Sequence, residues 1–154
     1  MYTNHESSLR ASEFWTVFGK YMAPVLSAEG KKTQWLNYAT GVKNLFFRMK
    51  AIGGVASISI ELVDRDITQQ QFYFHQLERQ KSFLHHILEE EWIWTGSQKA
   101  GTGSTANVSK TMTGVSIDRR EDWPMLITFF KPRIIALDQF WCLAKEAFQQ
   151  QDLT

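Results

Sequence analysis

Three carboxylates close together in the chain have the clearest catalytic potential in this sequence. Glu61, Asp64 and Asp66 stand at the end of a predicted β-strand. Nucleases that use Mg²⁺ place carboxylates at such strand ends, because hard cations prefer oxygen ligands. A restriction-type nuclease also needs an acid-x-Lys pair on a neighbouring strand, and the sequence here lacks one. A metal-dependent nuclease using these three acids is the alternative functional hypothesis, and Asp66 is equally suited to capping the next helix.

A second set of polar residues has the spacing of metal ligands on a helix. His85 with Glu89, and His86 with Glu90, are i,i+4 pairs that would share a helical face and could bind Zn²⁺. No further cluster of His or Cys stands near them in the sequence. A solvated helix face is the ordinary interpretation of such a pattern. We therefore predict no metal site and no cofactor.

Two other features suggest chemistry but have simpler explanations. The run 96–107, GSQKAGTGSTAN, is rich in glycine but lacks the Gly-Lys-Ser/Thr ending of a phosphate-binding loop, so we predict a flexible loop. Cys142 lies between Trp141 and Leu143 in an apolar helical stretch and is expected to pack as a small hydrophobe. Neither feature predicts a catalytic site.

The stretch 45–62, LFFRMKAIGGVASISIEL, predicts a β-hairpin with a defined register. Gly53 and Gly54 suit a two-residue type I′ turn, because glycine adopts positive φ without steric cost. That turn pairs Ile52 with Val55 and sets every later pair. One face then holds only apolar residues, from the pair of Ala51 with Ala56 outward, and the other is mostly polar. A slip of one residue would mix the faces, so the pattern specifies the register.

The polar face of this hairpin holds the candidate contact site. Phe46, Arg48 and Lys50 project from it, next to two serines and Glu61. An aromatic ring with two cations suits stacking and phosphate contact with single-stranded nucleic acid. It suits a protein partner or a second copy of the chain equally well, and Glu61 would weaken the positive field. A solvated face is the ordinary interpretation, and a protein interface is favoured over nucleic acid.

The remaining elements follow from periodicity and from helix start and stop signals. The stretch 33–38 is compatible with either a helical turn or the start of a strand. A proline inside the final helix, Pro132, predicts a kink or a restart there. The predicted helices run from Ser12 to about Met22, from about Asp66 to about Glu90, and from Asp122 to about Phe148; the further strands cover 91–95 and 108–117.

These elements predict an α+β fold, with a four-stranded antiparallel sheet and helices packed on one face, in the order α-β-β-α-β-β-α. A chain of 154 residues with 44% hydrophobic residues suits one domain, predicted at 12–148 with frayed tails at 1–11 and 149–154. The single cysteine and the polar N-terminus predict a cytoplasmic protein. No apolar run is long enough to predict a membrane segment.

Three stretches together resemble a bacterial family of unknown function, domain-of-unknown-function family 4268. They are Trp35-Leu36-Asn37 with Gly41 seven residues before Arg48, the strand 57–64 running into its helix, and Glu121-Asp122-Trp123-Pro124 opening a helix that reaches Phe130-Lys131-Pro132-Arg133. The resemblance covers roughly residues 12–140. It implies a role near nucleic acid or in phage defence, because members occur alone or at the C-terminus of proteins with restriction-nuclease-like domains. It implies no catalytic residues.

The leading functional hypothesis is therefore a non-enzymatic binding or accessory domain of a bacterial cytoplasmic protein. Its expected contact residues are Phe46, Arg48 and Lys50. We expect a protein partner or self-association rather than nucleic acid, and no contact with a membrane. The net charge of +1 excludes a strongly basic surface over the whole chain.

Overall fold

Four α-helices and a four-stranded sheet make up the fold in the computed structural model, which describes residues 4–100 and 103–149. The helices are α1 (Asn4–Met22), α2 (Ile67–Arg79), α3 (Lys81–Leu88) and α4 (Trp123–Gln149), with a 3₁₀ turn, η1 (Arg120–Asp122), before α4. The strands are β1 (Leu45–Ile52), β2 (Val55–Asp64), β3 (Ile93–Ala100) and β4 (Gly103–Thr113). All neighbours are antiparallel, in the order β1-β2-β4-β3. The predicted α+β fold class is confirmed.

The predicted register of the β1–β2 hairpin is confirmed at every pair. Ile52 lies opposite Val55, and the pairing continues to Leu45 opposite Leu62. Gly53 and Gly54 both have positive φ, at 61° and 78°, as a type I′ turn requires. Residues on the apolar face of β2 from Ala56 to Leu62 are buried, so this face is the one that packs on the core.

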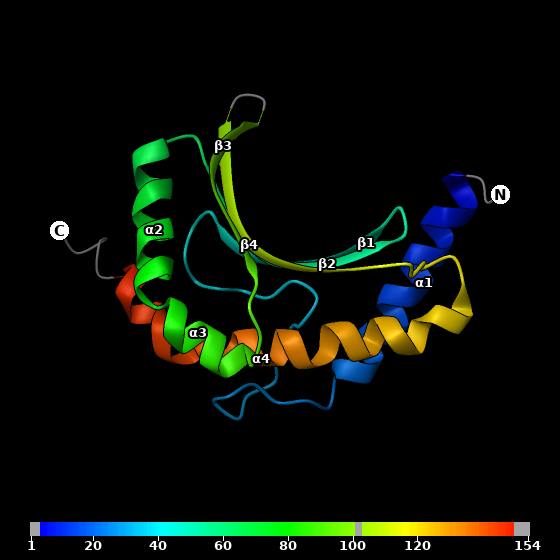
Figure 1. Ribbon diagram of the computed structural model, residues 1–154. Helices are drawn as coiled ribbons and strands as arrows, with labels where there is room; N and C mark the ends of the chain where they lie inside the picture. Colours follow the sequence, from blue (N-terminus) through cyan, green and yellow to red (C-terminus); the bar gives the residue numbers. More distant parts are fainter. Residues whose placement is uncertain (1–3, 101–102, 150–154) are drawn as a thin grey trace.

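The sheet is curved into a trough with two unlike sides (Figure 1). α2 and α4 pack against its convex side, while α1 and α3 pack on α4. No described helix covers the concave side (Figure 1). The prediction that helices pack on one face of the sheet is therefore confirmed.

Aromatic rings fill much of the core between the convex side and the helices. Phe14 and Phe18 of α1 are fully buried against Phe130 of α4. Trp123 at the start of α4 stacks edge-on against Phe14 and donates from its indole N–H to the Ile117 carbonyl, 2.8 Å away.

Among the described residues, no helix combines the length and the apolar character needed to cross a membrane.

The prediction of one continuous helix over 66–90 is wrong, because the chain changes direction at Gln80. Gln80 has φ −106° and ψ 13°, outside the helical region, and it separates α2 from α3. The change of direction lets α2 pack on the sheet while α3 packs on α4. The helical period persists across Gln80, because Leu77 before it and Leu84 after it are both fully buried. Glu89 ends α3 in a left-handed conformation, with φ 59°.

The segment 33–38 is neither helix nor strand, but part of a long irregular connection between α1 and β1. Trp35 is buried and donates to the Val25 carbonyl at 3.0 Å. The Tyr38 hydroxyl donates to the Asp138 carboxylate of α4 at 2.6 Å. Burial and this carboxylate raise the pKa of Tyr38, so the phenol stays protonated. These bonds fasten the connection onto α4.

The predicted flexible loop at 96–107 is wrong, since most of it belongs to β3 and β4. Ser104 to Thr113 pair with β2 along its whole length. The physical reason is visible in the alternation of this stretch, where Ala106 and Val108 are buried and Asn107 between them is not. β3 reaches Ala100 after an irregularity between Thr95 and Gln98.

Both ends of the chain differ from the predicted boundaries. α1 begins at Asn4, eight residues before the predicted start at Ser12, so part of the predicted tail 1–11 is helical. α4 ends at Gln149. Residues 1–3 and 150–154, which complete the two predicted tails, lie outside the described residues.

α4 does not restart at Pro132 but continues as one helix of 27 residues. A proline removes an amide donor and crowds the preceding turn, which weakens nearby helical hydrogen bonds. The carbonyl of Phe129 accepts a bond from the Arg133 guanidinium at 2.9 Å. This side-chain bond satisfies a carbonyl in the turn that the proline disturbs.

We expect Pro132→Ala to stabilise the protein. Interior proline costs a helix about 3 kcal/mol, and its restriction of the unfolded chain offsets about 0.4–1 kcal/mol of this, so the free energy of unfolding should rise by about 2 kcal/mol. Urea denaturation measures this change. Pro124→Ala is the matched control, because proline is tolerated in the first turn of a helix. Equal effects of the two substitutions would contradict the role assigned to Pro132.

Asp122 holds the turn that leads into α4. Its carboxylate accepts from the Ser116 amide at 2.8 Å and from the Arg119 side chain at 3.0 Å. The Ser116 bond, with a smaller contribution from Arg119, lowers the pKa of Asp122. These bonds close the loop that precedes the helix.

We expect Asp122→Asn to lower stability in a pH-dependent way. Because the pKa of Asp122 is lowered by folding, its charge stabilises the protein above the usual aspartate pKa of about 3.9, and this contribution is lost as the pH falls through the lowered value. The gap in melting temperature between the variant and the wild type should therefore be full near neutral pH and should close in acid. Glu121→Gln, at the exposed neighbouring position, should show no such gap.

Candidate partner-binding site

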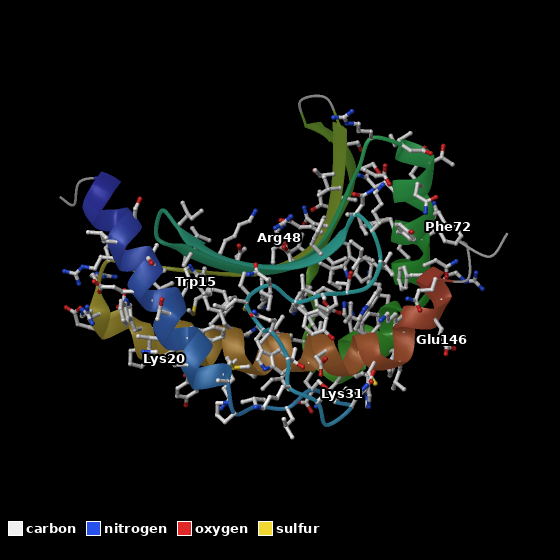
Figure 2. The ribbon with its side chains drawn as sticks, turned by 180° about the vertical axis from the view of Figure 1, so that it is seen from behind. Trp15, Lys20, Lys31, Arg48, Phe72 and Glu146 are labelled. Atoms are coloured by element: carbon white, nitrogen blue, oxygen red, sulfur yellow. The ribbon has the colours of Figure 1, made fainter. Side chains whose placement is uncertain are left out.

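The concave side of the sheet presents a largely uncharged surface of hydroxyl, amide and exposed apolar side chains around one charged cluster. Register places three rows of neighbours across β1, β2 and β4: Lys50, Ser57 and Thr111; Arg48, Ser59 and Ser109; and Phe46, Glu61 and Asn107. Figure 2 shows Arg48 on the side of the sheet that faces away from α4. The three predicted contact residues therefore lie together on the uncovered side.

Glu61 organises the cluster, because it pairs with both cations. Arg48 Nε lies 2.9 Å from one carboxylate oxygen, and Lys50 Nζ lies 3.3 Å from the other. Ser59 Oγ donates to the same carboxylate at 3.4 Å. The side chains of Arg48 and Lys50 stay 44% and 50% exposed, against 22% for Glu61. Part-exposed pairs of this kind stabilise a fold by only about 0–1 kcal/mol each, so their main effect here is to orient the cations.

Phe46 also contacts Arg48. The guanidinium carbon of Arg48 lies 4.4 Å from the centre of the Phe46 ring. Arg48 thus contacts both a ring and a carboxylate, with its exposed part toward the trough. Two cations and one carboxylate give the cluster a formal charge of +1, and the other described concave positions of the strands carry no charged residue.

The three acids of the nuclease hypothesis do not converge. Glu61 points into the trough, whereas Asp64 lies on the opposite face of β2 and accepts from Asn44 and from the Asp66 amide. Asp66 caps α2, accepting from the Thr68 amide at 2.9 Å. Each carboxylate thus has a structural partner, and the arrangement offers no shared cation position. Among the described residues, no group of three or more His, Cys, Asp or Glu side chains could hold a metal ion.

The histidine–glutamate pairs are separated by the end of α3. His85 accepts a bond from the Trp94 indole at 3.3 Å, and His86 is exposed. Glu89 lies at the left-handed end of the helix rather than on its face. Glu90 turns to Arg133, with two contacts of 2.9 and 3.1 Å. The four side chains therefore do not share the helical face that the i,i+4 spacing predicted.

Cys142 is exposed, so its predicted packing as a small hydrophobe is wrong. Partial desolvation and the nearby Glu29 carboxylate raise the pKa of the Cys142 thiol. A raised pKa lowers the thiolate fraction, which is the reactive form. This cysteine therefore lacks the environment of a catalytic nucleophile.

Two grooves were not visible in the sequence. One, of about 510 Å³, runs along the outer edge of β1 and is lined by 36–38 and 46–50. The other, of about 500 Å³, lies between β4 and α4 and includes Met112, Met125 and Phe129. An inward-facing Lys110 on β4 was a signal for the second groove. No local signal existed for the first, because one of its walls is the irregular connection before β1, whose path the sequence pattern does not specify.

The sequence comparison decides the family of this chain. The profile of one protein family, described as a domain of unknown function, matches residues 10–144. The chain belongs to the DUF4268 family. No curated protein and no solved structure matched it. Trp35 and Trp123 belong to the stretches that carried the resemblance. Both have a structural role in this DUF4268 chain, because each indole donates a hydrogen bond to a loop carbonyl next to a helix.

We expect Asp66→Ala to lower the free energy of unfolding by about 1 kcal/mol, because it removes the side-chain cap of α2. Asp66→Asn should keep most of the stability, since its amide oxygen can still accept from the Thr68 amide. Chemical denaturation of the three proteins checks this order. An Asp66→Ala protein as stable as the wild type would contradict the capping role.

Proposed function

We propose that this DUF4268 chain is a non-enzymatic binding domain whose partner contacts the concave side of the sheet. The observation that carries the proposal is the cluster of Phe46, Arg48 and Lys50 around Glu61. Its cations are oriented by neighbours yet half exposed, and they lie in a trough that no described helix fills. Such preorganised side chains lose little conformational entropy when a partner binds.

A protein partner is supported over nucleic acid by the charge of the trough. Nucleic-acid binding depends on several cations that each neutralise a phosphate. Here one carboxylate lies between two cations, and the described remainder of the concave side is neutral. Hydroxyl and amide side chains such as Ser109 and Asn107 suit hydrogen bonding to a polypeptide instead.

The cellular setting is part of the same proposal. The single cysteine supports a reducing cytoplasm. The association of similar chains with restriction-nuclease-like domains supports an accessory role in a bacterial system that acts on nucleic acid. In that setting the domain would bind a protein component, while another domain or chain performs the chemistry.

Reversal of the two cations tests the proposal. We expect Arg48→Glu with Lys50→Glu to weaken partner binding at least about tenfold, since each lost charge contact at an interface is worth about 1 kcal/mol or more. The partner is captured from the native host with the wild-type chain after nuclease treatment. It is then purified, and its affinity is measured for each variant.

Lys31→Glu with Lys32→Glu is the matched control, because both residues are exposed and Figure 2 shows Lys31 below α4, away from Arg48. Circular dichroism confirms folding. The charge reversal places two new carboxylates next to Glu61, which could unfold the chain. Arg48→Gln with Lys50→Gln removes the same two positive charges without adding negative ones, and is the second variant to measure. Unchanged affinity of folded Arg48/Lys50 variants would overturn the proposal.

A further inference from the structure

The edge of β1 leaves backbone groups available for another strand. In a two-residue hairpin, the residues that flank the turn exchange hydrogen bonds, and bonded pairs then recur at every second residue. The pair of Ile52 with Val55 therefore makes Lys50 and Arg48 bond to β2. The amides and carbonyls of Phe47, Met49 and Ala51 consequently point away from β2.

Two observed hydrogen bonds confirm this alternation. The Val63 amide donates to the Asn44 carbonyl at 2.9 Å, which continues the series of bonded pairs. The Leu45 carbonyl, one residue out of phase, accepts instead from the Thr40 hydroxyl at 2.8 Å outside the sheet. Beyond Leu45, the outward backbone groups of β1 have no partner among the described residues.

The two cations decide which strand this edge accepts. Side chains directly opposite each other on neighbouring antiparallel strands lie about 4.5–5.5 Å apart, and like charges there are destabilising. An antiparallel pair of two copies of β1 centred on Met49 would place Arg48 of one copy opposite Lys50 of the other. The cations therefore disfavour self-pairing, as charges on edge strands commonly do, and favour a strand with carboxylates at both positions.

The groove beside β1 would contact the side chains on the other face of such an added strand. Met49 is half-buried on the side of the sheet opposite to Arg48, and Leu36 and Tyr38 line the same groove. An incoming residue opposite Met49 would point toward this wall. The groove as a whole exposes more polar than apolar surface, but directly beside Met49 and Leu36 an incoming apolar side chain would contact carbon atoms.

We infer that β1 is the docking edge for an extended acidic segment of a partner protein. The segment adds as a fifth strand, antiparallel to β1, with carboxylates beside Arg48 and Lys50 and an apolar residue between them over Met49. This inference rests on the proposed function, since it uses the same cations, but it adds the backbone pairing and the acid-apolar-acid pattern. Nucleic acid has no regular backbone series of N–H and C=O groups that could pair with this edge.

Synthetic peptides test the pairing with the intact chain. The probe is an acetylated and amidated peptide, Thr-Val-Asp-Val-Glu-Val-Thr, in which the central valine takes the place opposite Met49. We expect it to shift the NMR signals and slow the hydrogen exchange of the Phe47, Met49 and Ala51 amides. A peptide with lysine in place of both acids should bind at least tenfold more weakly.

N-methylation separates strand pairing from simple charge attraction. The amide of the central valine faces β1, so methylating it should weaken binding at least tenfold. The amide of the neighbouring aspartate faces away, so methylating that position should leave the affinity within about twofold. Equal affinities of the two methylated peptides, or no shift at the three β1 amides at millimolar peptide, would overturn the inference. Displacement of the peptide by a single-stranded oligonucleotide, or protection of these amides by increasing protein concentration alone, would also overturn it.

A proline variant separates failure of this inference from failure of the proposed function. Ala51→Pro removes one outward amide and keeps Arg48 and Lys50, and proline is tolerated where an edge amide faces solvent. Loss of the native partner with both Ala51→Pro and the charge reversal supports strand addition. If the charge reversal abolishes binding of the native partner but Ala51→Pro does not, strand addition is overturned and the proposed function stands. Retention by both variants overturns both.

Discussion

The turn at Gly53 and Gly54 is the constraint on which the rest of this structure depends. Both residues have positive φ, which a residue with a β-carbon adopts only with strain. A two-residue turn leaves no freedom in the pairing of β1 with β2, and β2 in turn pairs with β4 along its whole length. The same alternation therefore decides which side of the sheet is core, which side is open, and which backbone groups of β1 remain unpaired.

α4 completes the fold by covering the apolar side that this register creates. It carries fully buried rings such as Phe130 and Phe140, and truncating one buried phenylalanine typically costs about 3–5 kcal/mol. It also anchors the irregular connection before β1, where the Trp141 indole donates to the Thr40 carbonyl at 2.7 Å. The Thr40 hydroxyl in turn binds the Leu45 carbonyl. One helix thus links the core to the beginning of the candidate docking strand.

Sequence reasoning succeeded where a local pattern has one low-energy solution. The hairpin register and the Asp66 cap follow from side-chain alternation, turn chemistry and capping alone. It failed where neighbours override the local preference. The stretch 96–107 is rich in residues typical of loops, yet pairing with β2 and burial of Ala106 make much of it a strand. The helical pattern across Gln80 contains no glycine or proline, yet packing against two different surfaces divides it.

For the candidate site, the sequence by itself determined that Phe46, Arg48, Lys50 and Glu61 share one face, because side chains of a strand alternate with a period of two and the turn sets the phase. Only the tertiary structure decided that this face stays uncovered and concave, that Glu61 pairs with both cations, and that the connection before β1 folds back to form a groove along it. The reason is physical: side-chain alternation is a local property of the backbone, whereas curvature and coverage depend on contacts between segments far apart in the sequence, and the groove depends on the path of an irregular connection.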